Sequence, residues 1–139
     1  MKYRKTLQRD LSFEGIGLHT SNHSVVRITP APDGTGIVFV VRGESIQVDH
    51  DSLNGSALGT NLVQGNCQIR TVEHLLSALC ACGITDAFVV TDATEIPILD
   101  GSAIDFFNGI ATVGAKKLSI FEPEIVRESI SVIDGEKYI

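Results

Sequence analysis

Apolar residues occur along most of the chain in short runs that are rich in β-branched side chains and are separated by turn signals. Such runs are typical of strands, because β-branched side chains pack well on a pleated surface. The segments predicted to be extended are residues 5–17, 24–29, 37–41, 60–63, 67–70 and 86–91. The first ends in Gly15-Ile-Gly17, where two glycines permit a bend or a close approach of backbones.

Residues 72–82 have the period of an amphipathic helix instead. Their apolar stripe consists of Val72, Leu75, Leu76 and Leu79. Thr71 is the predicted N-cap, Glu73 lies in the first turn, where the helix dipole favours an anion, and Gly83 is the predicted terminator.

A second helix is predicted for residues 103–113, where Ser102 and Asp105 match a capping pattern. Its apolar stripe consists of Ala103, Phe106, Phe107 and Ile110. Many strands followed by two amphipathic helices predict the α+β class, as a two-layer sandwich with both helices on one face of a mostly antiparallel sheet.

The pattern starts again after Gly114. Residues 115–123 have the composition of a linker, residues 125–133 are predicted to be a strand, and Asp134-Gly135 is a hairpin signal. The chain stops four residues after that signal, and a lone hairpin is at best marginally stable. We therefore expect an N-terminal domain over residues 1–114, a linker over 115–123, and the first hairpin of a truncated second domain over 124–139.

Composition narrows the functional classes. The 139 residues are 43% hydrophobic and carry a formal net charge of −6, which argues against disorder and against nucleic acid as the main partner. No apolar run approaches the roughly 18–20 residues of a membrane span, and no secretory signal is present, so we expect a cytoplasmic protein. The basic cluster Lys2, Arg4, Lys5 and Arg9 is interpreted as a solvated strand face. Cys80 and Cys82 are interpreted as reduced core residues.

Glu73-His74 is the pair most suited to chemistry. His74 lies off the apolar stripe in the first helical turn, so its ring can bind a metal, and Glu73 can act on water as a general base. The alternative is a capped, solvated helix end. A hydrolytic zinc site needs three protein ligands, and no other histidine forms an i, i+4 pair with His74.

Four further residues could contribute to a site. His19, in a glycine-flanked bend, either approaches a polar ligand or bonds to its own turn. The acidic residues Glu95, Asp100 and Asp105 are explained better by loop and capping roles than by catalysis.

Three motifs occur in the same order as in the UDP-3-O-acyl-N-acetylglucosamine deacetylase family, which the chain resembles over essentially its whole length. The motifs are Gly15-Ile-Gly-Leu-His-Thr20, Thr71-Val-Glu-His-Leu75 and Glu95-Ile-Pro-Ile-Leu-Asp-Gly-Ser-Ala103. Members of this family are zinc-dependent amidases that commit bacteria to lipid A synthesis. The resemblance implies two α+β domains of the ribosomal protein S5 domain 2-like kind, with the active site between them.

The resemblance also implies roles for residues of this chain. His74 matches a zinc ligand and Glu73 matches the general base, while Leu58, Gly59 and His19 match the surroundings of the substrate. The remaining zinc ligands, a His and an Asp, and a second catalytic His belong to the second domain of the family. We therefore expect Zn²⁺ as cofactor, UDP-3-O-acyl-N-acetylglucosamine and the missing C-terminal domain as partners, and no activity from this chain alone.

Two alternatives stay open. The chain could be a non-catalytic domain of the same fold that binds a partner or a nucleotide-sugar, or one half of a split enzyme. A His-x-x-x-Asp sequence downstream in the gene would distinguish the deacetylase from the first alternative.

Overall fold

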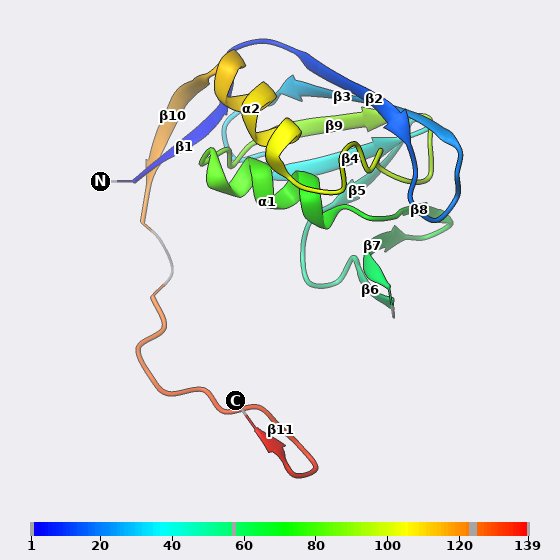
Figure 1. Ribbon diagram of the computed structural model, residues 1–139. Coiled ribbons are helices and arrows are strands. Elements are labelled where there is room, and N and C mark those ends of the chain that lie inside the picture. Colours follow the sequence, from blue (N-terminus) through cyan, green and yellow to red (C-terminus); the bar gives the residue numbers. More distant parts are fainter. Residues whose placement is uncertain (1, 57, 123–124, 139) are drawn as a thin grey trace.

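The computed structural model describes residues 2–56, 58–122 and 125–138, and its largest unit is a five-stranded sheet covered on one face by two helices (Figure 1). The strands are β2 (Leu11–Ile16), β3 (His23–Pro30), β4 (Ile37–Val41), β5 (Glu44–Gln47) and β9 (Ala87–Thr91), and the helices are α1 (Glu73–Ala81) and α2 (Ile104–Val113). The strand order is β2-β3-β9-β4-β5, and every neighbouring pair is antiparallel except β4 and β9. The predicted α+β class and the position of both helices are confirmed.

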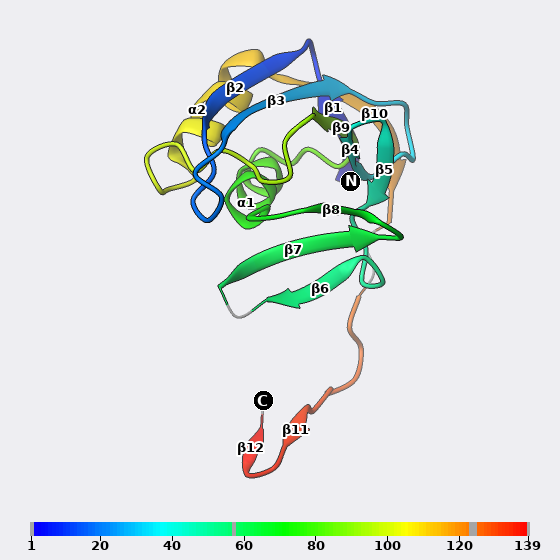
Figure 2. The same ribbon diagram turned by 90° about the vertical axis from the view of Figure 1, so that its right-hand side faces the viewer.

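A smaller, three-stranded sheet lies beside the N-terminal end of α1 (Figure 2). Its strands are β6 (Leu53–Ser56), β7 (Gly59–Gln64) and β8 (Cys67–Ile69), all antiparallel. The extended segments predicted over residues 60–63 and 67–70 are therefore confirmed as β7 and β8. The third strand of this sheet, β6, has no continuous apolar run, and the sequence pattern did not predict it.

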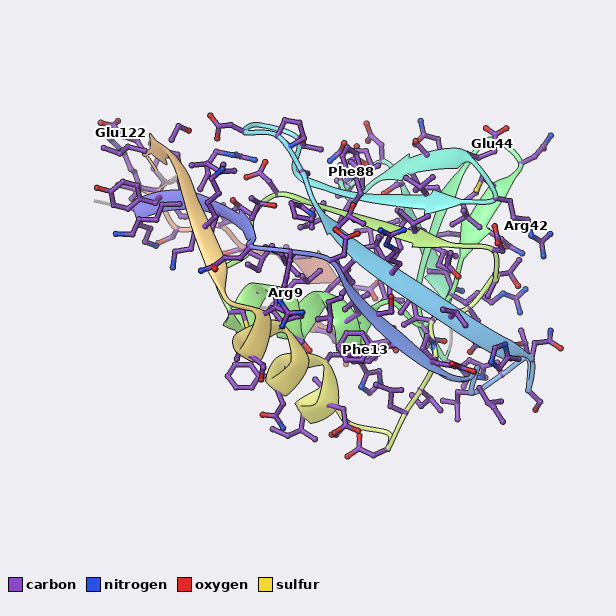
Figure 3. The ribbon with its side chains drawn as sticks, turned by 90° about the horizontal axis from the view of Figure 1, so that it is seen from above. Arg9, Phe13, Arg42, Glu44, Phe88 and Glu122 are labelled. Atoms are coloured by element: carbon purple, nitrogen blue, oxygen red, sulfur yellow. The ribbon has the colours of Figure 1, made fainter. Side chains whose placement is uncertain are left out.

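The hydrophobic core lies between the large sheet and the helices. Strand β3 alternates between exposed and buried residues, so that Val26 and Ile28 face the helices while Val25 and Arg27 face away. The ring of Phe13, which is labelled in Figure 3, meets the ring of Phe106 on α2 edge to face, with centroids 4.8 Å apart. This contact between the two rings holds α2 against β2.

Helix α1 confirms the predicted stripe but not the predicted cap. Leu75 and Leu79 are buried, and Gly83 ends the helix with φ +70° while Ile84 N–H bonds to the Leu79 carbonyl. Thr71 is not the N-cap: the cap position is Val72, and no side chain caps it. The Thr71 hydroxyl bonds to a distant carboxylate instead, as described below.

Helix α2 repeats this outcome. Phe106 and Ile110 are buried as predicted, whereas Phe107 is 37% exposed. The capping pattern of Ser102 and Asp105 is wrong, because Ala103 is the cap residue and no side chain caps it. The Ser102 hydroxyl accepts the Ile104 N–H and donates to Asp100, so it organises the preceding loop.

The extended segment predicted over residues 5–17 is two strands in different sheets. Strand β1 (Lys2–Leu7) ends before the irregular residues 8–10 and pairs antiparallel with β10 (Ala115–Phe121), away from β2. The linker predicted over residues 115–123 is accordingly wrong for residues 115–121. Its end at residue 123 and the start of the next segment at residue 124 lie outside the described residues. The division into domains stays a prediction.

The strand predicted over residues 125–133 is not formed. Residues 125–132 are exposed and form no helix or strand, while β11 (Ile133–Asp134) and β12 (Lys137–Tyr138) make a short hairpin around Gly135 and Glu136. The hairpin signal is confirmed, with the turn one residue later than predicted. Among the described residues, no strand or helix of the other sheets lies over this segment (Figure 1).

Two further observations complete the fold. Within the described ranges, no helix is long and apolar enough to cross a membrane. Cys80 is exposed and Cys82 is half-buried, so the prediction that both fill the core is wrong for Cys80.

Candidate active site

Glu95 joins the three sequence motifs at one point. Its carboxylate is 1% exposed and accepts hydrogen bonds from the His19 and Thr20 backbone N–H groups, at 3.0 and 2.8 Å. The Thr20 hydroxyl donates to it at 2.7 Å, and the Thr71 hydroxyl at 2.8 Å. Glu95 therefore ties the bend around His19 to the segment that begins α1.

The ionised form of Glu95 is strongly favoured. Burial by itself would raise the pKa of this carboxyl, but the hydrogen bonds from Thr20, His19 and Thr71 outweigh burial and lower the pKa to about 2. Glu95 is thus a charged, saturated structural group at neutral pH. The expected loop role is confirmed, although loop composition alone did not indicate its burial.

Backbone contacts hold the same three motifs together. A Cβ atom at Gly17 would lie 2.3 Å from Glu95 Oε2, so only glycine fits there, as the predicted close approach requires. Gly17 forms an isolated bridge with Pro97, and Arg70 forms one with Glu95. The segment after β9 thereby runs between the His19 bend and the start of α1.

Glu73 lies at the start of α1, against the first residues of β7. Its carboxylate is half-buried, and Oε2 accepts the Thr60 N–H at 3.0 Å. Oε1 faces Gly59, where an added Cβ would lie 3.2 Å away. The structure thus brings Glu73 and Gly59 together, and the hydrogen bond to Thr60 orients the carboxylate.

His74 follows Glu73 on the helix and is half-buried. Hydrogen bonds from the Ser102 N–H and hydroxyl lower the pKa of Asp100. Across the described ranges, no three His, Cys, Asp or Glu side chains come together as a metal site. Within these ranges His74 could therefore supply a metal with one ligand only.

His19 and Leu58 line one concavity of about 310 Å³, together with Asn61 and Arg70. Leu58 directly precedes Gly59, which faces Glu73, but Glu73 does not itself line this concavity. The sequence-based interpretation had included His19 and Leu58 but not Asn61 or Arg70. Arg70 immediately precedes the Thr71–Leu75 motif, and that adjacency was the available signal.

The comparison with known protein families identifies the family of this chain. The family model described as UDP-3-O-acyl N-acetylglycosamine deacetylase matches residues 4–139. The chain belongs to this deacetylase family. Three relatives that are named UDP-3-O-acyl-N-acetylglucosamine deacetylase show how far the similarity extends.

The relative from Geobacter sp. (strain M21) is 37% identical over 99% of this chain and 47% of its own length. The relative from Geotalea uraniireducens (strain Rf4) is 35% identical over 100% of this chain and 47% of its own length. The relative from Thermodesulfovibrio yellowstonii is 37% identical over 99% of this chain and 50% of its own length. The chain therefore spans about half the length of the curated deacetylases that it matches.

Proposed function

We propose that this chain is the N-terminal domain of a zinc-dependent amidohydrolase that removes the N-acetyl group from UDP-3-O-acyl-N-acetylglucosamine, in the cytoplasm, as a step of lipid A synthesis. Membership of the deacetylase family supports the reaction and the substrate. The observation that carries the proposal is the position of Glu73 beside His74, with its carboxylate oriented by the Thr60 N–H. The second half of the protein would lie against this end of α1.

The residues of this chain have distinct roles in the proposed reaction. Glu73 takes a proton from the attacking water and later gives it to the leaving amine, because it is the half-buried carboxylate whose orientation is held by one backbone donor. His74 supplies one ligand to Zn²⁺, and the remaining ligands come from the second domain. When bound, zinc supplies Lewis-acid chemistry that polarises the amide carbonyl. His19, Leu58 and Gly59 contact the substrate next to Glu73.

The experiment measures acetate release and bound zinc in the full-length protein that contains this chain. We expect one zinc per protomer and release of acetate from UDP-3-O-acyl-N-acetylglucosamine, and we expect His74→Ala to lose both. His50→Ala is the matched control, since its side chain is 98% exposed in the loop between β5 and β6. Absence of acetate release by the wild-type protein, or normal zinc content in His74→Ala, would contradict the proposal.

The 139-residue chain by itself offers a second test. One histidine ligand does not hold catalytic zinc, so we expect neither deacetylase activity nor tight zinc binding. Equilibrium dialysis that found one zinc per chain at micromolar affinity, abolished by His74→Ala, would show that the ligand set is complete within these residues.

A further inference from the structure

The two-stranded ribbon of β1 and β10 forms a second region of functional interest, well away from Glu73. Glu73 begins α1, whereas the ribbon lies beside Gly83, directly after the other end of that helix. Figure 1 shows the ribbon at the opposite end of the domain from β6 and β7. Any ligand at the ribbon is therefore separate from the proposed active site.

The ribbon concentrates positive charge in an acidic protein. Its strands carry five of the chain's eleven Lys and Arg residues and no Asp or Glu, although the formal net charge of the chain is −6. Arg4 is neutralised by an ion pair with buried Asp86. The four lysines of the two strands form no ion pair with any carboxylate in the part of the chain that the structure describes.

Three of these lysines surround one concavity. Lys2, Lys5 and Lys117 line an open space of about 470 Å³, together with Tyr3, Gly83, Thr85 and Phe121. Lys5 and Lys117 are direct cross-strand partners, and the Lys117 ammonium lies 4.6 Å from the centre of the Tyr3 ring. Like charges placed opposite each other destabilise a strand pair, so this arrangement costs stability unless an anion occupies the space between them.

We propose that this concavity binds a phosphate-bearing anion, with Lys2, Lys5 and Lys117 neutralising its charge. Lysine is a common phosphate ligand because its ammonium is a compact charge with three donors. Tyr3 and Phe121 form the apolar part of the wall, against which the organic group of a phosphate ester can pack. A soluble phosphate ester and a phospholipid headgroup share this chemistry, and the test below distinguishes them.

The sequence interpretation of Lys2 and Lys5 as a solvated strand face did not include Lys117. Lys117 comes from a segment that was predicted to be a linker, and only the pairing of β1 with β10 places it opposite Lys5. Glu122 follows β10 directly, at the end of the ribbon (Figure 3), and forms no ion pair with a described lysine.

The first experiment titrates the 139-residue chain with inorganic pyrophosphate at low ionic strength and follows backbone amide chemical shifts. We expect saturable shifts at Lys5, Gly83 and Lys117. Loss of one charge within a few ångströms of an exposed anion costs about fivefold in affinity, so Lys117→Gln should raise the Kd about fivefold. Lys5→Gln combined with Lys117→Gln should raise it about twentyfold or more.

The matched control is Lys116→Gln. Lys116 is exposed, adjacent to Lys117 and equal in charge, but it does not line the concavity, so its substitution should change the Kd less than twofold. If Lys116→Gln and Lys117→Gln weakened binding equally, the overall positive charge of the ribbon would explain the binding without the concavity. That result would overturn the proposal. Thermal unfolding of each variant checks the fold, and we expect a change in Tm of only a few degrees, because Lys117→Gln removes both the repulsion from Lys5 and the contact with the Tyr3 ring.

The second experiment identifies the source of the phosphate. The same variants are sedimented with phosphatidylcholine vesicles, with and without phosphatidylglycerol. Binding to pyrophosphate with the expected dependence on Lys117 supports a soluble ligand, and binding only to the anionic vesicles with that dependence supports a lipid headgroup. Binding to neither probe overturns the proposal.

Discussion

Glu95 and Glu73 belong to neighbouring motifs, yet the fold surrounds the two carboxylates in opposite ways. Glu95 is 1% exposed and accepts four hydrogen bonds, which saturate it and keep it ionised. Glu73 is half-buried, is oriented by the Thr60 N–H, and lies against Gly59. The comparison teaches that the deeply buried acid, whose pKa is lowered, is the structural one. The acid that we propose for proton transfer is the one that stays partly exposed.

The largest expected effect is the loss of catalytic activity when Glu73 is replaced. In the full-length protein, Glu73→Gln should lower kcat by roughly 10²–10⁴-fold, because an amide accepts the Thr60 N–H but cannot act as a base. Steady-state rates and metal analysis on the same sample check this, and zinc content should be unchanged. Parallel loss of zinc and rate would mean that Glu73 is a ligand rather than the base.

Glu95→Ala should have the complementary effect on stability. It leaves the partly buried N–H groups of His19 and Thr20 and the buried Thr71 hydroxyl without their acceptor, and a buried group left in this way costs about 1–3 kcal/mol. We expect the free energy of unfolding of the 139-residue chain to fall by about 3 kcal/mol or more in urea titrations. The same measurement on Glu73→Ala should show a smaller loss of about 1 kcal/mol, because only the Thr60 N–H loses its acceptor there. Equal effects would erase the distinction between the two acids.

The pH dependence of stability should carry the signature of Glu95. Its pKa is about 2 in the folded chain and about 4.5 when unfolded, so its contribution is complete above pH 4.5 and is lost as the pH falls towards 2. The shift corresponds to about 3 kcal/mol. Urea unfolding between pH 6 and pH 2 should therefore show a difference between wild type and Glu95→Gln that shrinks over this window. A difference that does not change with pH would contradict the assignment.

Thr71→Val should have a smaller effect of the same kind. It removes one hydroxyl donor to Glu95 and keeps the size of the side chain, which costs about 1–2 kcal/mol in the free energy of unfolding. Thr71→Ser keeps the donor and is the matched control, with less than half of that loss expected. Chemical denaturation of both variants checks the order.

The smallest effect concerns the segment after β10. Residues 125–132 are exposed and form no helix or strand, whereas Lys116 and Lys117 lie in a paired strand. Limited trypsin digestion should therefore cut at Arg127 and Lys137 before it cuts at Lys116 or Lys117. The Tm of the chain cut at Arg127 and Lys137 should differ from that of the intact chain by a few degrees at most. Earlier cleavage at Lys117 would show that the β1–β10 ribbon does not protect its backbone.

The local elements of this protein could be predicted from the sequence. The β-branched runs of β3, β4 and β9 and the 3.6-residue period of α1 and α2 arise from neighbouring residues, so they are visible without tertiary contacts. The pairing of Glu73 with His74 is likewise a sequence feature, and its catalytic interpretation came from the order of three motifs.

The tertiary structure alone decided the roles that depend on distant partners. Thr71 matches an N-cap by its position, but its hydroxyl bonds to Glu95, 24 residues away, and Thr20 reaches the same carboxylate from 75 residues away. Lys117 lies in a segment with the composition of a linker, but this segment forms β10, which pairs with β1. A buried carboxylate recruits whichever donors the fold brings to it, and an edge strand pairs with whichever strand comes alongside. Those choices are set by packing, which is why sequence periodicity could not predict them.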